Sequence, residues 1–283
     1  MTSVLDDEAL EAKALGTAAG IRRRRYLGLV AGWLGFLGIW YLIAWLVGNE
    51  NKMPSPGRVI HEIDKIFNGD PDFANDDGGI FWNNFNASVL RVFLGFATGV
   101  VLGTPLGFLM GRSRYWMALL RSPVMILGSI PGLTYAVMVL VVFGISFIGP
   151  VMAIGLISMP YIAINVAEGV RGVDKGLINM STAFGRTPEQ VFRNVVLPSV
   201  LPFIFAGVRL SFSLAWKVGQ LTEVFGSSEG IGFQIRRNFQ LFNLPAVISW
   251  VALFIVFMLI LERFILVRLE RRLFRWRQWE RES

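Results

Sequence analysis

The sequence predicts an all-α, polytopic membrane protein with six transmembrane helices. Hydrophobic residues make up 54% of its 283 residues and charged residues only 17%, whereas a soluble domain has about a quarter charged residues. The mean hydropathy is +0.55. A transmembrane helix needs roughly 20 mostly apolar residues. The stretches that meet this requirement are 26–47, 88–110, 119–143, 147–166, 203–222 and 246–267.

Lys and Arg residues are distributed unevenly among the loops, and cytoplasmic loops carry the excess of these residues. With the amino terminus inside, the inside segments hold 18 of the 27 Lys and Arg residues and the outside segments hold five. We therefore expect both termini in the cytoplasm. The first apolar stretch is too long for the core of a signal peptide, so we expect an uncleaved span.

The expected segments follow from this orientation. They are a cytoplasmic tail (1–25), a first transmembrane helix (26–47), a periplasmic segment (48–87), a core of five transmembrane helices (88–267) that includes a cytoplasmic loop (168–200), and a basic cytoplasmic tail (268–283). Within the periplasmic segment, residues 58–67 predict a short amphipathic helix. The tail interleaves Trp and Arg, which is typical of contact with an anionic inner leaflet.

The composition excludes several classes of function. The chain has no Cys and a single His, His61, which excludes disulfides, thiolate metal sites and multi-histidine sites. None of its Lys residues follows a Gly, so it lacks the phosphate-binding loop of an ATPase. No catalytic set stands out, and we predict that the chain is not an enzyme. The net charge of +7 comes from short Arg runs beside apolar segments, which favours membrane topology over nucleic-acid binding.

The cytoplasmic loop carries the signals of a helix that starts and stops sharply. Asp174 is a typical N-cap residue for a helix that runs on through Phe184. Gly185 follows at the position where a helix end in the left-handed conformation requires Gly.

A second helix is predicted directly after Gly185. Thr187 can cap it, Pro188 suits the first helical position, and Gln190 completes a capping box three residues after the cap. Leu197-Pro198 is predicted to end this helix. The loop is therefore a helix–glycine–helix hairpin, which could be a lever for a soluble partner or an ordinary ordered loop.

The sequence resembles the permease subunits of binding-protein-dependent ABC importers, in the branch that handles nitrate, sulfonates, taurine, bicarbonate and related compounds. The family's cytoplasmic loop has a Gly, nine residues, an aliphatic residue, any residue, Leu and Pro, which match Gly185, Val195, Leu197 and Pro198. Further similar motifs are Pro54-Ser55-Pro56, Arg91 with Gly95-Phe96, Ile130-Pro131, Phe143-Gly144, 168–174, 201–209, and Glu223 with Gly230-Ile231-Gly232-Phe233.

This resemblance implies a type I importer permease fold of the MetI-like kind in a bacterial inner membrane. It implies a dimer, most simply a homodimer, with a pair of ATPase subunits that bind ATP and Mg, and a periplasmic or surface solute-binding protein. This chain would bind no cofactor itself. The residues that the resemblance assigns to ATPase coupling are Asp174, Ala183, Phe184, Gly185, Arg186, Thr187, Pro188, Glu189, Leu197 and Pro198.

The sequence departs from the family's pattern in two places. The Glu-Ala-Ala triplet of the cytoplasmic loop is replaced by Asn179-Met180-Ser181, so the acidic residue is missing. In the third span, Thr134 and Val137 stand where the family has a small residue and a second proline. Both are candidates to line the translocation pathway.

Lys217 is a charged residue deep inside a predicted span, where ionisable groups are costly and usually functional. It lies 14 residues past Phe203, roughly 20 Å along a helix. Our hypothesis is that Lys217 faces the pathway and attracts an anionic solute. Alternatively, it pairs with Glu223 or a backbone carbonyl, or reaches the outer interface. Glu223, with Gly230–Gly232 beside it, would shape an outer gate.

The charges near span ends, which are Arg91, Glu262 and Arg263, are interpreted as anchors or local pairs. Arg209, the seventh residue of the span that begins at Phe203, is expected to snorkel to the cytoplasmic surface. The function predicted overall is that of the permease subunit of an ATP-driven importer of a small organic or inorganic anion. The alternative is an ATP-independent secondary transporter or channel, which would be expected to show an inverted repeat. No such repeat stands out.

Overall fold

The computed structural model describes residues 27–69, 79–266 and 268, and the regular elements within these ranges are helices, as predicted. The chain divides into two compact units, Met1–Glu62 and Ile63–Ser283. The predicted tail 1–25, residues 70–78 and nearly all of the basic tail lie outside the described residues.

A first helix, Leu27–Val47, precedes α2. The elements that follow are α2 (Pro56–Asn68), α3 (Gly79–Arg112), α4 (Arg114–Ser129), α5 (Gly132–Phe143), α6 (Ile148–Arg171), α7 (Lys175–Ala183), α8 (Pro188–Val191), the π-helical turn η1 (Phe192–Val196), α9 (Leu197–Gly226), α10 (Ile231–Gln240), α11 (Leu244–Leu261) and the π-helical turn η2 (Glu262–Leu266).

In the first unit, nearly all side chains of the helix Leu27–Val47 are exposed, as expected of a span surrounded by lipid. The indole nitrogen of Trp40 donates a hydrogen bond to the carbonyl of Pro54 at 3.0 Å, and this bond fixes the turn that follows the span. Near the start of α2, Arg58 pairs with Glu62 one turn later at 3.2 Å. The short helix predicted over 58–67 is therefore confirmed.

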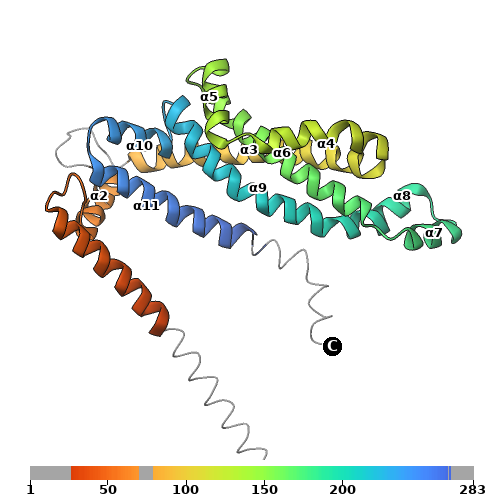
Figure 1. Ribbon diagram of the computed structural model, residues 1–283, viewed down its shortest axis with the longest axis horizontal. Helices are drawn as coiled ribbons and strands as arrows, with labels where there is room; N and C mark the ends of the chain where they lie inside the picture. The colour runs from red at the N-terminus through yellow and green to blue at the C-terminus, as the bar shows by residue number, and fades with distance from the viewer. Residues whose placement is uncertain (1–26, 70–78, 267, 269–283) are drawn as a thin grey trace, which may run out of the picture. The chain divides into compact units, whose positions relative to one another are not determined.

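In the second unit, α3, α6 and α9 pack side by side and form the centre (Figure 1). A ladder of glycines on α3 brings its backbone against α6. At each of them a Cβ atom would come within 2.5–2.7 Å of an atom of α6. Membrane helices use small residues in this way, because van der Waals contact replaces the hydrophobic effect as the force that joins them. The ladder consists of Gly95, Gly99, Gly103, Gly107 and Gly111.

The third predicted span, 119–143, is wrong as a single straight helix. It is divided between α4 and α5, which are bent by 93° relative to each other. The break lies at Ile130-Pro131, where Ile130 is extended (ψ 127°) and Pro131 becomes the N-cap of α5. A residue before Pro avoids the helical region, and Pro has no N–H to continue the hydrogen-bond ladder. Among the described residues, five helices could cross a membrane, or six if the bent pair is one span.

The prediction that Leu197-Pro198 ends the second loop helix is also wrong. The helical run continues from Pro188 to Gly226 without interruption. The turn η1 precedes Pro198, and the amide of Leu197 donates to the carbonyl of Phe192, five residues earlier. Pro198 falls in the first turn of α9. The wider π-helical turn places Pro198 where its missing N–H costs little, so the helix continues past it instead of ending.

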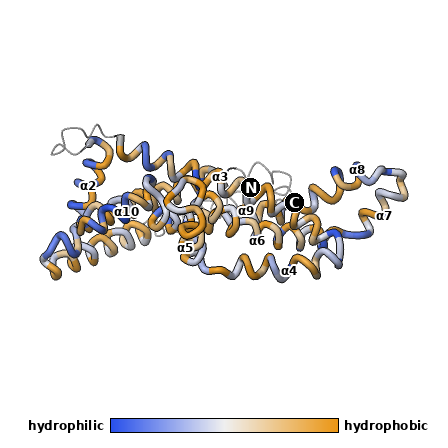
Figure 2. The backbone as a smooth tube through the Cα atoms, turned by 90° about the horizontal axis from the view of Figure 1, so that it is seen from above, coloured by the Kyte–Doolittle hydropathy of each residue, from blue (hydrophilic) through white to orange (hydrophobic). Residues whose placement is uncertain are grey.

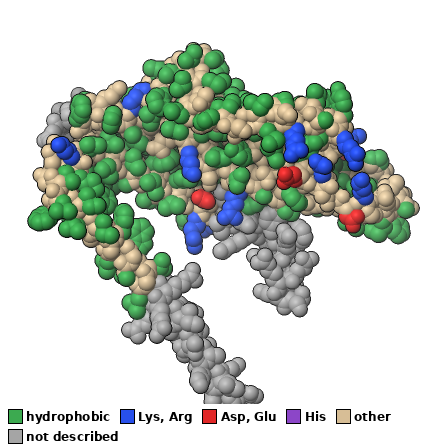
Figure 3. Space-filling view, in the orientation of Figure 1, with side chains coloured by type: hydrophobic (Ala, Val, Ile, Leu, Met, Phe, Trp, Pro, Cys, Tyr) green, Lys and Arg blue, Asp and Glu red, His purple; other side chains and the backbone are tan. Residues whose placement is uncertain are grey.

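Within the second unit, α7 and α8 lie at one end of the long helices and α10 lies at the other (Figures 1 and 2). Hydrophobic residues follow the long helices between these ends, while α10 contains a hydrophilic stretch (Figure 2). On the face shown in Figure 3, Lys and Arg side chains gather toward the end that carries α7 and α8. This is the end that the sequence predicts to be cytoplasmic.

Candidate functional site

Two groups of residues stand out, one at each end of the long helices. We call residues 174–198 the coupling hairpin. Both of its helix starts are capped as predicted. Oδ1 of Asp174 accepts from the amide of Gly176 at 2.7 Å. Oγ1 of Thr187 accepts from the amide of Gln190 at 3.3 Å, and Oε1 of Gln190 accepts from the amide of Thr187 at 3.1 Å, which completes the capping box beside Pro188.

The chain reverses between the two helices at Gly185, whose φ of +73° is the left-handed conformation that the sequence predicted. The amide of Gly185 donates to Thr182 at 2.9 Å, and the amide of Arg186 donates to Ser181 at 3.1 Å. These two bonds are those of a Schellman motif, which satisfies the last carbonyls of α7. The turn is therefore fixed by backbone geometry.

The tip of the coupling hairpin is exposed over residues 182–190. Phe184 is 78% exposed, and Leu177 and Met180 on the same helix are also exposed. An exposed apolar group of this kind marks an interaction site. An open pocket beside the turn is lined by Met180, Ser181, Phe184, Gly185, Arg186 and Gln190.

The coupling hairpin is directly continuous with a long helix. The run Pro188–Gly226 contains 39 residues, about 58 Å at the helical rise. It therefore connects the exposed tip to the opposite end of the unit as one continuous helical run, which includes the π-helical turn η1.

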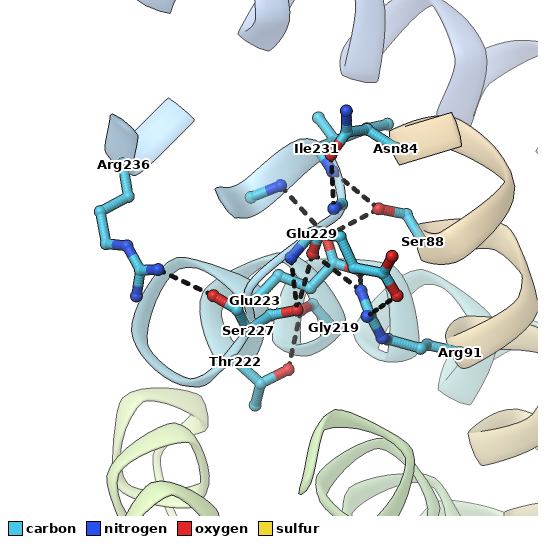
Figure 4. Close-up of polar contacts among 12 residues, drawn as sticks. Asn84, Ser88, Arg91, Gly219, Thr222, Glu223, Ser227, Glu229, Ile231 and Arg236 are labelled. Atoms are coloured by element: carbon cyan, nitrogen blue, oxygen red, sulfur yellow. Dashed lines mark hydrogen bonds and ion pairs between the residues drawn. The ribbon is translucent and has the colours of Figure 1, made fainter. Parts of the chain in front are cut away.

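The second group lies where α3, α9 and α10 meet (Figure 4). Asn84, Ser88 and Arg91 are spaced four and three residues apart and share one face of α3. Oδ1 of Asn84 accepts from the amide of Gly230 at 2.8 Å, and Oγ of Ser88 accepts from the amide of Ile231 at 2.9 Å. Side chains of α3 thus hold the first amides of α10.

Glu223, near the end of α9, is the centre of this group and is only 2% exposed. Its Oε2 accepts from Oγ of Ser88 at 2.7 Å and from the amide of Gly232 at 3.1 Å. Its Oε1 accepts from Nη1 of Arg91 at 3.2 Å. We call Asn84, Ser88, Arg91, Glu223 and 230–232 the polar clamp.

Arg91 is buried to the same degree, with 2% exposure. Besides Glu223 it donates to the carbonyl of Glu229 at 2.9 Å and to the Glu229 carboxylate at 2.7 Å. Its guanidinium also lies 5.1 Å from the ring centre of Phe147. The interpretation of Arg91 as a member of a local pair is confirmed, but its burial and its second carboxylate were not predicted.

Among the pathway candidates, Glu223 belongs to the polar clamp, whereas Thr134 and Val137 lie on α5 and Lys217 lies about two turns earlier on α9. Thr134 and Val137 on α5 are exposed, as is Lys217 on α9. The start of α5 packs on α9 close to Lys217, because a Cβ atom at Gly132 would lie 3.0 Å from Val218.

Lys217 has no hydrogen-bond or ion-pair partner within the described part of the chain. The alternative that it pairs with Glu223 is wrong, because Arg91 and Ser88 occupy that carboxylate. Over the same described ranges, no group of three His, Asp or Glu side chains could hold a metal ion.

Comparison with known proteins identifies the family. Residues 99–276, more than half of the chain, match the family described as "Binding-protein-dependent transport system inner membrane component". The chain belongs to this family. It is a multi-pass membrane permease of a bacterial ABC importer, as the resemblance implied.

Several relatives match the permease over most of their length. A probable ABC transporter permease of Brucella abortus (strain 2308) is 29% identical over 90% of this chain and 98% of its own. The putative aliphatic sulfonates transport permease SsuC of Bacillus subtilis is 28% identical over 85% and 84%. The nitrate import permease NrtB of Leptolyngbya laminosa is 29% identical over 78% of both chains.

Among solved structures, the MetNI methionine ABC transporter resembles the permease with a TM-score of 0.60 and 21% identity, covering 69% of this chain and 96% of that one. This likeness confirms the type I importer fold. Permease subunits are transport components, and the ATPase activity of such importers lies in a partner subunit.

Proposed function

We propose that this permease forms half of the pathway of an ATP-driven importer and takes its energy from an ATPase pair that docks on the coupling hairpin. The observation that supports the proposal is the exposed, doubly capped tip at one end of an unbroken helical run. The partner ATPases would bind ATP and Mg, a solute-binding protein would dock on the opposite side, and two copies of the permease would enclose the pathway.

The docking contact would be made by Asp174, Ala183, Phe184, Gly185, Arg186, Thr187, Pro188 and Glu189, with Leu197 and Pro198 at the entry to α9. Phe184 would supply the apolar anchor, since a large exposed aromatic side chain contributes most when a partner buries it. Asn179 is exposed on α7 in place of the family's acidic residue, so the charged part of the contact would come from Arg186 and Glu189.

Closure of the ATPase pair would then move the coupling hairpin as a rigid body. Because η1 and α9 continue the second hairpin helix, the displacement would reach the far side of the membrane with little loss in loops. The pathway would be opened alternately to each side.

Replacement of Gly185 by Val should detach the ATPase. A β-branched residue is strongly disfavoured at positive φ, so the Schellman turn would be lost and the tip reshaped. Gly185→Asn is the matched control, because Asn tolerates this conformation and should retain the partner. Co-purification of the ATPase in detergent measures the effect. Full recovery of the ATPase with Gly185→Val, together with normal ATP-driven uptake, would contradict the proposed docking.

We propose further that the solute is a small anion such as a sulfonate, nitrate, taurine or an aromatic acid. Lys217 is exposed and unpartnered among the described residues, and a charged side chain within a span is costly against lipid, which favours a water-filled pathway beside Thr134 and Val137. The names of the sulfonate and nitrate permeases among its relatives agree with this charge preference. Glu223 and the start of α10 would shape the far end of the pathway.

Lys217→Gln should slow uptake at limiting solute by about tenfold, the factor that corresponds to about 1.4 kcal/mol of lost attraction. Lys217→Arg keeps the positive charge and should lose much less. Transport into proteoliposomes that contain the ATPase and the binding protein measures both. Equal uptake by the Gln variant at limiting solute would remove Lys217 from the pathway, and uptake that ignores ATP depletion would favour a secondary transporter.

A further inference from the structure

The facing ends of α9 and α10 satisfy each other's unpaired backbone groups. The carboxylate of Glu223 on α9 accepts from the amide of Gly232 in the first turn of α10. In return, Arg236 on α10 donates to the last carbonyls of α9 and its cap, those of Val224 at 3.0 Å, Phe225 at 3.2 Å and Ser227 at 2.7 Å. Helix ends carry amides and carbonyls that need partners. Here a side chain of each helix provides the partner for backbone groups at the end of the other helix, and these bonds join α9 and α10 into one body.

The polar clamp then fastens this body to α3. Asn84 and Ser88 hold the amides of Gly230 and Ile231, and Arg91 holds both Glu223 and Glu229. These contacts join residues more than 130 positions apart in the sequence. The two oxygens of Glu223 accept three hydrogen bonds between them, two of which come from α3. Movement of α9 away from α3 would break those two bonds and leave the Glu223 carboxylate buried without its ionic partner.

Close backbone contacts prevent sliding as well as separation. Gly230 has a φ of +108°, and a Cβ atom there would lie 2.6 Å from Oε2 of Glu223. At Gly232 a Cβ atom would lie 2.6 Å from both the carbonyl of Gln220 and the Cβ of Glu223. The start of α10 therefore fits α9 at one position only, because interfaces packed this tightly do not deform continuously.

We propose that the polar clamp stays closed throughout the transport cycle, so that α9, α10 and the neighbouring part of α3 move as one body, with Arg91 and Glu223 as its positioning residues. The inference rests on the proposed docking of an ATPase on the coupling hairpin. A displacement of the coupling hairpin is transmitted along α9, and the polar clamp determines that α10 and the neighbouring part of α3 move with it. The moving joints of the pathway lie elsewhere in the permease.

A cross-link between α3 and α9 tests the proposal directly, and the absence of Cys from the chain leaves no background. A Cβ atom at Gly219 would lie 3.0 Å from Cγ2 of Val92, so the pair is close enough for a disulfide. Neither residue belongs to the polar clamp. Val92→Cys/Gly219→Cys, reconstituted with the ATPase and binding protein, should transport equally well oxidised and reduced. Transport that stops on oxidation and recovers with a reductant would overturn the proposal.

Glu223→Gln tests the positioning role, because it keeps the size of the side chain and removes the charge that holds Arg91. The ATPase should still co-purify, while solute imported per ATP hydrolysed should fall by about tenfold, equivalent to about 1.4 kcal/mol of lost positioning energy. Arg91→Gln should behave in the same way and Arg91→Lys should recover part of the loss. Arg237→Gln, on the exposed side of α10, is the matched control.

The two proposals fail in different ways. If the unmodified permease retains no ATPase, the docking proposal is wrong and the ratio of solute to ATP has no meaning. If the ATPase binds but the Gln variants import as much solute per ATP as the unmodified permease, docking stands and the positioning role of Arg91 and Glu223 is wrong. Should Glu223→Gln fail to fold, Arg91→Lys and the cross-linked variant still decide the result.

Discussion

Replacement of Gly107 by Leu should prevent the permease from folding stably. A Cβ atom at this position would lie 2.6 Å from the carbonyl of Ala163 and 2.6 Å from the Cβ of Val166. Neither atom can move aside by side-chain rotation, because the carbonyl oxygen of Ala163 is backbone and the Cβ of Val166 is bonded directly to the backbone. Extra atoms in a packed interior typically lower the free energy of unfolding by about 1–3 kcal/mol, and occasionally by more. Leu adds four carbons at a backbone contact, so we expect a loss above that range.

Thermal unfolding in detergent, followed by the fraction of monodisperse protein, measures this effect. Gly107→Ala should lower the midpoint by several degrees, at roughly 2–4 °C per kcal/mol for a chain of this size, and Gly107→Leu should leave little folded protein. Gly35→Leu is the control, because nothing lies within 4 Å of a Cβ atom there. A monodisperse Gly107→Leu variant with an unchanged midpoint would show that α3 and α6 are not in backbone contact.

Glu223→Ala is expected to destabilise the fold by the next largest amount, about 3–5 kcal/mol, because breaking a buried ion pair is strongly destabilising and Arg91 keeps only the exposed carboxylate of Glu229 as an ionic partner. Arg91 has only 2% exposure, so its guanidinium is shielded from bulk solvent. The amide of Gly232 and the hydroxyl of Ser88 would lose their acceptor at the same time. The unfolding midpoint should fall by roughly 10 °C.

A double substitution separates the two contributions to this loss. Arg91→Met/Glu223→Leu removes both charges, and apolar residues of similar volume are often neutral replacements for a buried ion pair. Its midpoint should therefore lie above that of Glu223→Ala alone. If the double variant is the less stable of the two, the ion pair itself stabilises the fold, and the loss of the buried partner of Arg91 matters less than we infer.

Features set by neighbouring residues could be predicted from the sequence. The spans followed from apolar length, because a bilayer imposes a minimum on any helix that crosses it. Both caps of the coupling hairpin and the left-handed Gly185 followed from residue types at fixed offsets, since cap geometry involves only a few consecutive residues.

Features that depend on distant partners or on competing local signals were missed. Ile130-Pro131 could have indicated the bend, but the uniformly apolar flanks favoured one continuous span. Pro198 indicated a helix end because a π-helical turn before it has no sequence signal of its own. The spacing of the glycines on α3, every fourth residue from Gly95, was a signal of close helix packing that could have been found.

The polar clamp illustrates the same limit at the candidate site. Asn84, Ser88 and Arg91 lie on one helix face, which the sequence allowed, but nothing near them in the chain indicated Glu223 as their common partner. The choice of Lys217 as a possible partner for Glu223 relied on closeness along α9. In three dimensions, Arg91 on the neighbouring helix α3 contacts Glu223 instead.

The π-helical turn at Phe192–Val196 links the direction of the exposed tip of the coupling hairpin to that of Lys217. Each residue of an α-helix rotates its side chain by about 100° around the axis. The number of residues between the tip and Lys217 therefore determines the azimuth of one relative to the other, and the wide turn contributes its own fixed rotation. Gaining or losing a single residue along α9 would aim an intact tip and an intact Lys217 toward different neighbours.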